Sequence, residues 1–297
     1  GAAMPPQVIE IPSTDAVTLT AYRWDPDGPP RAIVQLTHGM GEHLLRYEAL
    51  ADELTRAGFV VVGQDHRGHG ATATEDGWGA LGPGGWDELV RDIGRVSSHI
   101  RGSLADQPDL PLVLLGHSMG SFAAQQYVLD HGDELAGLVL TGTAAIDLLE
   151  PALDLDAPLD LSAFNAPFEP ARTDYDWLSR DPAQVDAYVA DPRCGFGLSQ
   201  VDGKQMFASA RQLADPARLA GVRADLPVYV AVGDQDPVNG QLALVHGLVQ
   251  RLQGAGMTDV TLTIYEGARH EVLNETNRDE VVADLLTWLD RVAPSRD

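Results

Sequence analysis

The sequence has little cysteine, little positive charge and no long apolar run. Cys194 is its single cysteine, so no disulfide can form within the chain and no cluster of thiolates can bind a metal ion. No apolar run approaches the roughly 18 residues that a membrane span needs, and the first ten residues lack a basic stretch followed by an apolar one. We therefore expect a soluble, cytoplasmic protein that does not insert stably in a membrane.

Acidic residues outnumber basic ones by 44 to 20, which gives a formal net charge of −24. A balance of this sign repels the phosphate backbone of nucleic acids and anionic lipid surfaces. The acidic residues are scattered along the chain, as on a solvated surface. The composition argues against nucleic acid as a partner and leaves the oligomeric state open.

Short apolar segments alternate with amphipathic ones over most of the chain. Two β-rich stretches, "QVIEIPS" and "VTLTAYRWD", come first and predict a hairpin at the edge of a sheet. The later apolar runs are typical of strands buried on both faces, and the amphipathic segments are typical of helices. The alternation predicts an α/β fold with a mostly parallel central sheet flanked by helices.

The alternation stops near Ala145 and resumes at "LPVYVAVGDQD". The intervening segment, residues 146–222, is rich in Pro, Asp and aromatic residues and contains a helix that begins at Asp181-Pro182. A stretch of this length is too long for a plain loop in a compact domain. We interpret it as a helical cap inserted into a core formed by residues 4–145 and 223–297.

The stretch "GHSMG" places Ser118 at the carboxyl end of "LPLVLLGHS", the most apolar strand candidate. That strand should lie near the centre of the sheet, and ligands bind at the carboxyl edge of such sheets. A sharp turn from strand to helix needs small residues two before and two after its middle residue, and Gly116 and Gly120 meet that need. We expect Ser118 to be a nucleophile at the start of a helix.

A nucleophilic serine needs a base, and the base needs an acid that orients it. His270 directly follows "VTLTIYEGAR", at the position where a strand candidate passes into a loop, whereas His246 lies in the middle of a predicted helix. The strand candidate "VYVAVG" is followed by Asp234 and Asp236. We expect His270 to be the base and Asp236 to be the acid, with Asp234 as the alternative.

A further loop follows the strand that should neighbour the nucleophile strand. It contains the sequence "HGMG" at residues 38–41. Because backbone N–H groups in such a loop can point at the reacting oxygen, we expect the N–H groups of Met40 and Met119 to form an oxyanion hole.

At these residues the sequence resembles the α/β-hydrolase superfamily, and within it the monoacylglycerol lipase and lysophospholipase-like group, bacterial type. The resemblance rests on "HGMGEH", "DHRGHG", "GHSMG", "GDQDPV", "YEGARHEVLNE" and, in the cap, "DWLSRDPAQVDAYVADP". It implies the α/β-hydrolase fold, a triad of Ser118, His270 and Asp236, and an oxyanion hole from Met40 and Met119. It also implies no cofactor and no metal, a small-molecule ester as the partner, and a cap that shapes an acyl pocket.

These features predict a serine hydrolase that cleaves carboxylic esters through an acyl-enzyme. The group resemblance and the aromatic cap favour monoacylglycerol-like or other single-chain monoesters. Lysophospholipids, short-chain esters and aromatic monoesters remain alternatives, as do thioesterase or lyase chemistry on the same triad. A ligand-binding receptor with slow turnover on this fold is an alternative of another class.

Overall fold

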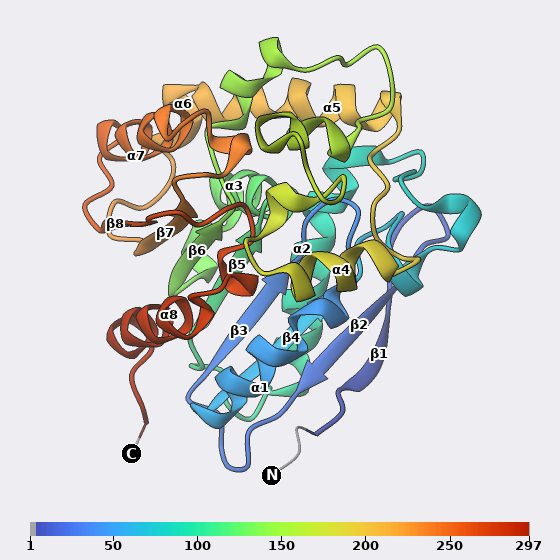
Figure 1. Cartoon of the computed structure of the whole chain (residues 1–297). Coiled ribbons are helices and arrows are strands. Elements are labelled where there is room, and N and C mark those ends of the chain that lie inside the picture. Colours follow the sequence, from blue (N-terminus) through green and yellow to red (C-terminus); the bar gives the residue numbers. More distant parts are fainter. Residues whose placement is uncertain (1–3, 297) are drawn as a thin grey trace.

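The structure is a computed structural model that describes residues 4–296 (Figure 1). Within these residues, eight strands form one sheet in the order β1-β2-β4-β3-β5-β6-β7-β8. The strands are β1 Gln7–Pro12, β2 Thr18–Trp24, β3 Ala32–Thr37, β4 Phe59–Gln64, β5 Leu112–His117, β6 Gly137–Thr141, β7 Val228–Gly233 and β8 Val260–Tyr265. β1 and β2 pair antiparallel at one edge, and the strands from β4 to β8 in this order pair parallel. The predicted edge hairpin and the mostly parallel sheet are confirmed.

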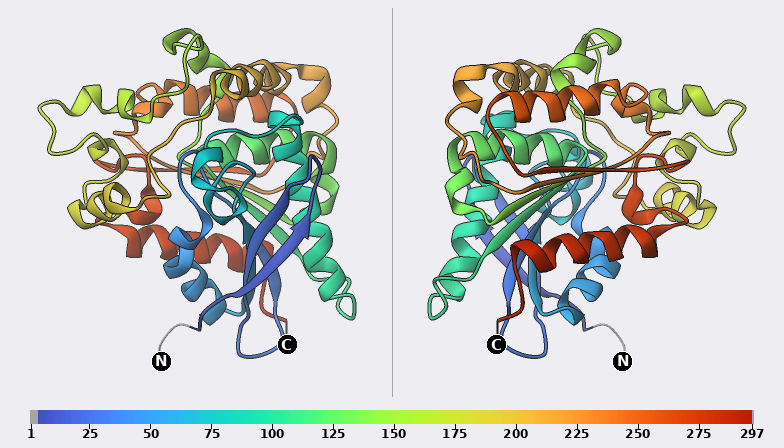
Figure 2. Two further views of the ribbon diagram at one scale, coloured as in Figure 1. Left: turned by 90° about the vertical axis from the view of Figure 1, so that its right-hand side faces the viewer. Right: turned by 90° about the vertical axis from the view of Figure 1, so that its left-hand side faces the viewer.

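Helices cover both faces of the sheet. The longer helices of the core are α1 Glu48–Arg56, α2 Gly85–Ser103, α3 Met119–His131, α7 Ala243–Gly254 and α8 Arg278–Val292. Apolar side chains of α2, α3 and α7 pack on one face, and those of α1 and α8 pack on the other. Figure 2 shows α7 and α8 on opposite sides of the strands. Within residues 4–296, no helix is both long and apolar enough to cross a membrane.

The centre of the sheet follows from the apolar pattern. All six residues of β3, β4, β5 and β7 are buried, because helices cover these strands on both sides. β5 lies between β3 and β6, as its apolar sequence predicts. The carboxyl ends of β3, β5, β7 and β8 therefore point in the same direction and bring the loops that follow them together.

The segment between β6 and β7 packs over these carboxyl ends (Figures 1 and 2). It contains the helices α4 Pro182–Ala190, α5 Gln200–Ala210 and α6 Pro216–Leu219. Asp181 caps α4 by accepting a hydrogen bond from the Ala183 N–H, as the Asp-Pro pair predicts. The helices within residues 146–178 are short 3-10 helices. Two of them contain a proline, Pro151 or Pro167, which has no N–H to donate inside a longer α-helix.

Three buried histidines hold the loop after β3 against the loop after β4. The His38 and His66 rings lie 4.2 Å apart, and the His38 and His69 rings lie 5.2 Å apart. His38 Nε2 accepts a hydrogen bond from the His66 N–H (3.0 Å), so His38 Nδ1 carries the proton and donates to the Gly39 carbonyl (2.7 Å). Burial, together with the charge that each ring would impose on the others, keeps these rings neutral.

The same burial shifts their titration. Burial lowers the pKa of His38 well below 6.5, the pKa of His66 to about 3 and the pKa of His69 to about 4. Between pH 6.5 and about 4 the unfolded chain binds protons at these positions and the folded chain does not. We predict that the free energy of unfolding falls as the pH is lowered through this window, by up to about 1.4 kcal/mol per pH unit for each histidine.

Urea unfolding of the wild type, His66→Gln and His246→Gln at pH 7 and pH 5 measures this effect. His66→Gln should show a smaller loss of stability between the two pH values than the wild type. His246 is exposed on α7, so His246→Gln should keep the wild-type loss. Equal losses in His66→Gln and the wild type would contradict the prediction.

Candidate active site

Ser118 lies on a strained turn between β5 and α3. Its backbone has φ 52° and ψ −120°, a conformation that residues with side chains rarely adopt. The turn is so tight that a Cβ on Gly116 would lie 2.5 Å from the Gly120 carbonyl oxygen, and one on Gly120 would lie 2.2 Å from the Thr37 carbonyl oxygen. The Ser118 N–H donates to the Thr141 carbonyl at the end of β6 (2.9 Å). This geometry places the Ser118 side chain at the carboxyl edge of the sheet, pointing away from both β5 and α3.

His270 and Asp236 come together from the loops after β8 and β7. His270 Nδ1 lies 2.8 Å from Asp236 Oδ2, and both residues are at least 97 % buried. The other carboxylate oxygen of Asp236 accepts from the Val238 N–H (2.9 Å), which fixes the carboxylate plane. Asp234, the alternative acid, instead accepts from the Gly267 N–H. Of the two aspartates, Asp236 is the one hydrogen-bonded to the imidazole.

The pKa of His270 lies above its ordinary value. Burial alone would lower this pKa, but the charge and the hydrogen bond of Asp236 more than offset it, and the charges of Glu271 and Glu42 add to the rise. Asp236 thus stabilises the protonated imidazole of His270, which is the form that a general base takes after it has accepted a proton.

Neighbouring rings hold His270 in position. The Trp177 ring lies 4.8 Å from it and the His117 ring 4.9 Å from it. Burial and the charge of His270 lower the pKa of His117 to about 4, so its ring is neutral near pH 7. Gly142 packs on the edge of both imidazoles, because a Cβ there would lie 3.0 Å from His270 Cε1. The imidazole of His270 therefore has little room to rotate.

Met40 and Met119 both flank Ser118. Met119 is the first residue of α3, where the backbone N–H groups have no partner inside the helix. Met40 follows Gly39, and a Cβ on Gly39 would lie 3.3 Å from the Ser118 Cβ. The backbone of the loop after β3 thus lies against the Ser118 side chain.

Three charged residues connect the loop after β3 with the loop after β8. Glu42 Oε2 accepts from the Gly39 N–H (2.8 Å), and Arg46 bridges Glu42 and Glu271 at 2.8 and 2.7 Å. No pattern in the sequence assigns a role to Glu42, Arg46 or Glu271. Glu42 and Arg46 are four residues apart beside the "HGMG" loop, and Glu271 is next to His270. Their charge and their position beside predicted catalytic loops are the features of the sequence that could have indicated a role for them.

One cavity of about 510 Å³ contains most of the predicted site residues. Ser118, His270, Met40 and Met119 line it, and Asp236 lies behind His270. The rest of its lining is mostly apolar and comes largely from the segment between β6 and β7, including Ile146, Leu149, Leu153, Leu159, Phe164, Met206 and Phe207. No hydrogen bond joins Ser118 Oγ to His270 within residues 4–296; such contacts often tighten only when substrate binds.

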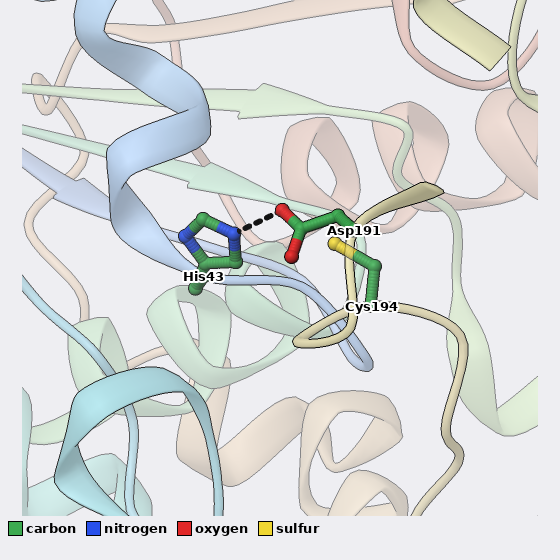
Figure 3. A group of neighbouring side chains, drawn as sticks. All are labelled: His43, Asp191 and Cys194. Carbon is green, nitrogen blue, oxygen red and sulfur yellow. Dashed lines mark hydrogen bonds and ion pairs between the residues drawn. The ribbon is translucent and has the colours of Figure 1, made fainter. Parts of the chain in front are cut away.

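Among residues 4–296, two groups of side chains have the composition of a metal site. His43, Asp191 and Cys194 place one potential ligand atom each within 4.8 Å of the others (Figure 3). His43 Nε2 and Asp191 Oδ2 are already hydrogen-bonded at 2.6 Å, and burial raises the pKa of the Cys194 thiol, which favours the neutral form that metals bind poorly. In the second group, Glu42, His117 and Glu271, the Arg46 guanidinium pairs with both carboxylates. Both groups are best described as hydrogen-bonded networks.

Comparison with known proteins gives a consistent result. The model of the family described as "Serine aminopeptidase, S33" matches residues 28–277. A monoacylglycerol lipase of Mycolicibacterium smegmatis is 34 % identical over 90 % of this chain and 90 % of its own length. The monoglyceride lipase of Homo sapiens is 31 % identical over 89 % of this chain and 83 % of its own length.

Solved structures agree with these sequence matches. A thermostable carboxyl esterase from Bacillus coagulans in complex with glycerol superposes with a TM-score of 0.85 and 30 % identity, over 98 % of this chain and all of that one. A soluble variant of monoglyceride lipase from Saccharomyces cerevisiae superposes with a TM-score of 0.79 over 99 % of this chain and 97 % of that one; at 20 % identity it supports the fold alone. The chain therefore belongs to the serine hydrolase family described as "Serine aminopeptidase, S33", and it has the α/β-hydrolase fold.

Proposed function

We propose that this chain is a serine hydrolase of carboxylic esters that acts through an acyl-enzyme. The observation that carries the proposal is the strained Ser118, which faces the same cavity as His270 while His270 Nδ1 is held by Asp236. In this assignment Ser118 is the nucleophile, His270 is the general base, and Asp236 orients the imidazole and stabilises its cation.

The reaction has two symmetrical halves. His270 Nε2 takes the proton of Ser118 Oγ as that oxygen attacks the ester carbonyl, and it then gives the proton to the departing alcohol. The carbonyl oxygen becomes negative in the tetrahedral intermediate, where the N–H groups of Met40 and Met119 would stabilise it. Water then attacks the acyl-enzyme by the same route and releases the carboxylic acid and free Ser118.

A monoacylglycerol-like monoester is the substrate we propose. The relatives named as monoacylglycerol or monoglyceride lipases support it. The cavity of about 510 Å³ lies within the usual range for a small-molecule site, and its apolar lining suits one acyl chain. Asp154 and Asp160 are exposed at the same cavity and would repel an anionic head group, which favours a neutral glycerol ester over a lysophospholipid with an acidic head.

The segment of residues 146–222 is the cap in this proposal. It supplies most of the apolar lining of the cavity, together with Asp154 and Asp160, while the loops after β3, β5, β7 and β8 supply the proposed catalytic residues. The division of the chain into core and cap would thus separate recognition of the acyl chain from the chemistry.

Removal of the Ser118 hydroxyl tests the nucleophile. Ser118→Ala should lower the kcat for p-nitrophenyl esters and for monoacylglycerols by at least about 10⁴-fold, because no acyl-enzyme can form. Ser98→Ala, on the exposed side of α2, is the matched control and should keep wild-type turnover. A Ser118→Ala enzyme that retains a tenth of the wild-type kcat would refute the assignment. A wild type that binds esters stoichiometrically without turnover would indicate a receptor.

The pH dependence of kcat/KM tests the base. Only neutral His270 can accept a proton, so kcat/KM should rise with pH through a pKa above 6.5. Asp236→Asn removes the charge that raises this pKa, so the rise should move to lower pH while kcat falls about 10⁴-fold. Asp234→Asn is the matched control and should leave the position of the rise unchanged, since Asp234 binds the Gly267 N–H. A rise at the same pH in the wild type and Asp236→Asn would argue against this pairing.

A further inference from the structure

The loop of residues 39–43, here called the oxyanion loop, is in contact with residues 188–198, here called the clamp segment. The Gly41 carbonyl oxygen accepts two hydrogen bonds from the clamp segment, from the Tyr188 hydroxyl (2.9 Å) and from the Gly195 N–H (3.0 Å). The Leu198 N–H lies 3.4 Å from Met40 Sδ. The clamp segment thus binds both the backbone and the side chain of the oxyanion loop.

Close packing supports these hydrogen bonds. Gly41 has φ +67°, and a Cβ there would lie 2.1 Å from the Phe196 carbonyl oxygen. The Phe196 ring stacks on Trp78 at 5.9 Å and lies 5.0 Å from the His69 ring. The clamp segment is therefore fixed to the core on one side and to the oxyanion loop on the other.

A third contact joins the far end of the oxyanion loop to the clamp segment. His43 and Asp191 meet at 2.6 Å, and Figure 3 shows the two side chains facing each other from opposite segments. The other carboxylate oxygen of Asp191 accepts from the Arg193 N–H (2.9 Å), so the carboxylate is also fixed by the backbone of the clamp segment. His43 is 92 % buried, which makes this hydrogen bond less exposed to competition from water.

The orientation of the Met40 N–H depends on these contacts. Gly39 C=O and Met40 N–H belong to one planar peptide group, and His38 Nδ1 holds that carbonyl from the core side. The clamp segment holds the chain at Gly41, the next residue after Met40. The peptide that carries the proposed oxyanion donor is thus fixed from both directions, once by the core and once by the clamp segment.

We propose that Tyr188 and Asp191 are positioning residues for hydrolysis, which hold the oxyanion loop so that the Met40 N–H points at the developing oxyanion. This inference rests on the proposed function. It makes the segment between β6 and β7 a contributor to turnover of every ester, in addition to its part in lining the cavity. Loss of one oxyanion donor typically lowers kcat by about 10²–10³-fold, which sets the upper limit of the effect.

The substitutions Tyr188→Phe and Asp191→Asn distinguish a role in positioning the oxyanion loop from a role in lining the cavity. Tyr188 also lines the cavity, and phenylalanine keeps its ring while it removes the hydrogen bond to Gly41. Tyr265→Phe is the matched control for the first, because its hydroxyl binds Asp284 on α8. Asp186→Asn is the matched control for the second, because Asp186 lies on α4, which ends just before Asp191, and pairs with Arg172 at the surface.

The experiment measures kcat and KM for p-nitrophenyl acetate, butyrate and octanoate, with the melting temperature of each variant. Each substitution should lower kcat by about 5- to 20-fold, and the double variant by about 10²-fold, by the same factor for all three esters. KM should change by less than about twofold. The rate of phosphorylation of Ser118 by a p-nitrophenyl dialkyl phosphate should fall in parallel, since its phosphoryl oxygen also becomes negative beside Met40 as nitrophenolate leaves. Both controls should match the wild type.

Three results would overturn the inference: an unchanged kcat in both variants, a loss confined to the octanoate ester, or an equal loss in Asp186→Asn. If Tyr188→Phe lowers the melting temperature strongly, Asp191→Asn alone decides. Failure of the proposed function shows differently, as a wild type without turnover on any ester or as a Ser118→Ala variant that keeps it.

Discussion

The backbone conformation of Ser118 is the constraint on which the rest of the site depends. A positive φ at a residue with a side chain costs free energy, of the order of 1–3 kcal/mol, and it persists only where the surroundings enforce it. Here β5 is buried in the middle of the sheet, α3 starts at the next residue, and Gly116 and Gly120 let strand and helix approach each other closely. Because the turn is held so tightly, the loops after β3, β7 and β8 can be arranged around a fixed serine.

Those loops are held together by buried charge. Burial alone would raise the pKa of Glu271, but the charge and the hydrogen bond of Arg46 outweigh burial and lower this pKa to about 2. The Glu271 carboxylate is therefore ionised beside His270. Arg46 also binds Glu42, whose other oxygen accepts from the Gly39 N–H. Removing one partner from such a buried network leaves an uncompensated charge and typically costs about 3–5 kcal/mol. The network thus makes the distance between the oxyanion loop and the His270 loop a fixed property of the fold.

The sequence was sufficient for features that depend on local pattern. The apolar run of β5 predicts its central place, the glycines around Ser118 predict the tight turn, and Asp181-Pro182 predicts the start of α4. It was insufficient where distant segments meet. Arg46 and Glu271 are 225 residues apart, and Tyr188 reaches Gly41 across 147 residues, so no spacing in the sequence indicates either contact. Within the expected helical cap, residues 146–178 contain short 3-10 helices, whose three-residue turns do not produce the 3.6-residue periodicity by which a sequence indicates an α-helix.

The segment over the cavity combines two physical tasks that need different properties. Lining an acyl pocket needs apolar volume, which neighbouring side chains can supply in many combinations without loss of folding. Holding a backbone N–H in place needs hydrogen bonds of defined length and direction, which tolerate little change. In the function proposed for this chain, residues 146–164 would carry most of the first task and residues 188–198 the second. Substrate preference can therefore change in the first part while the geometry around Ser118 is preserved by the second.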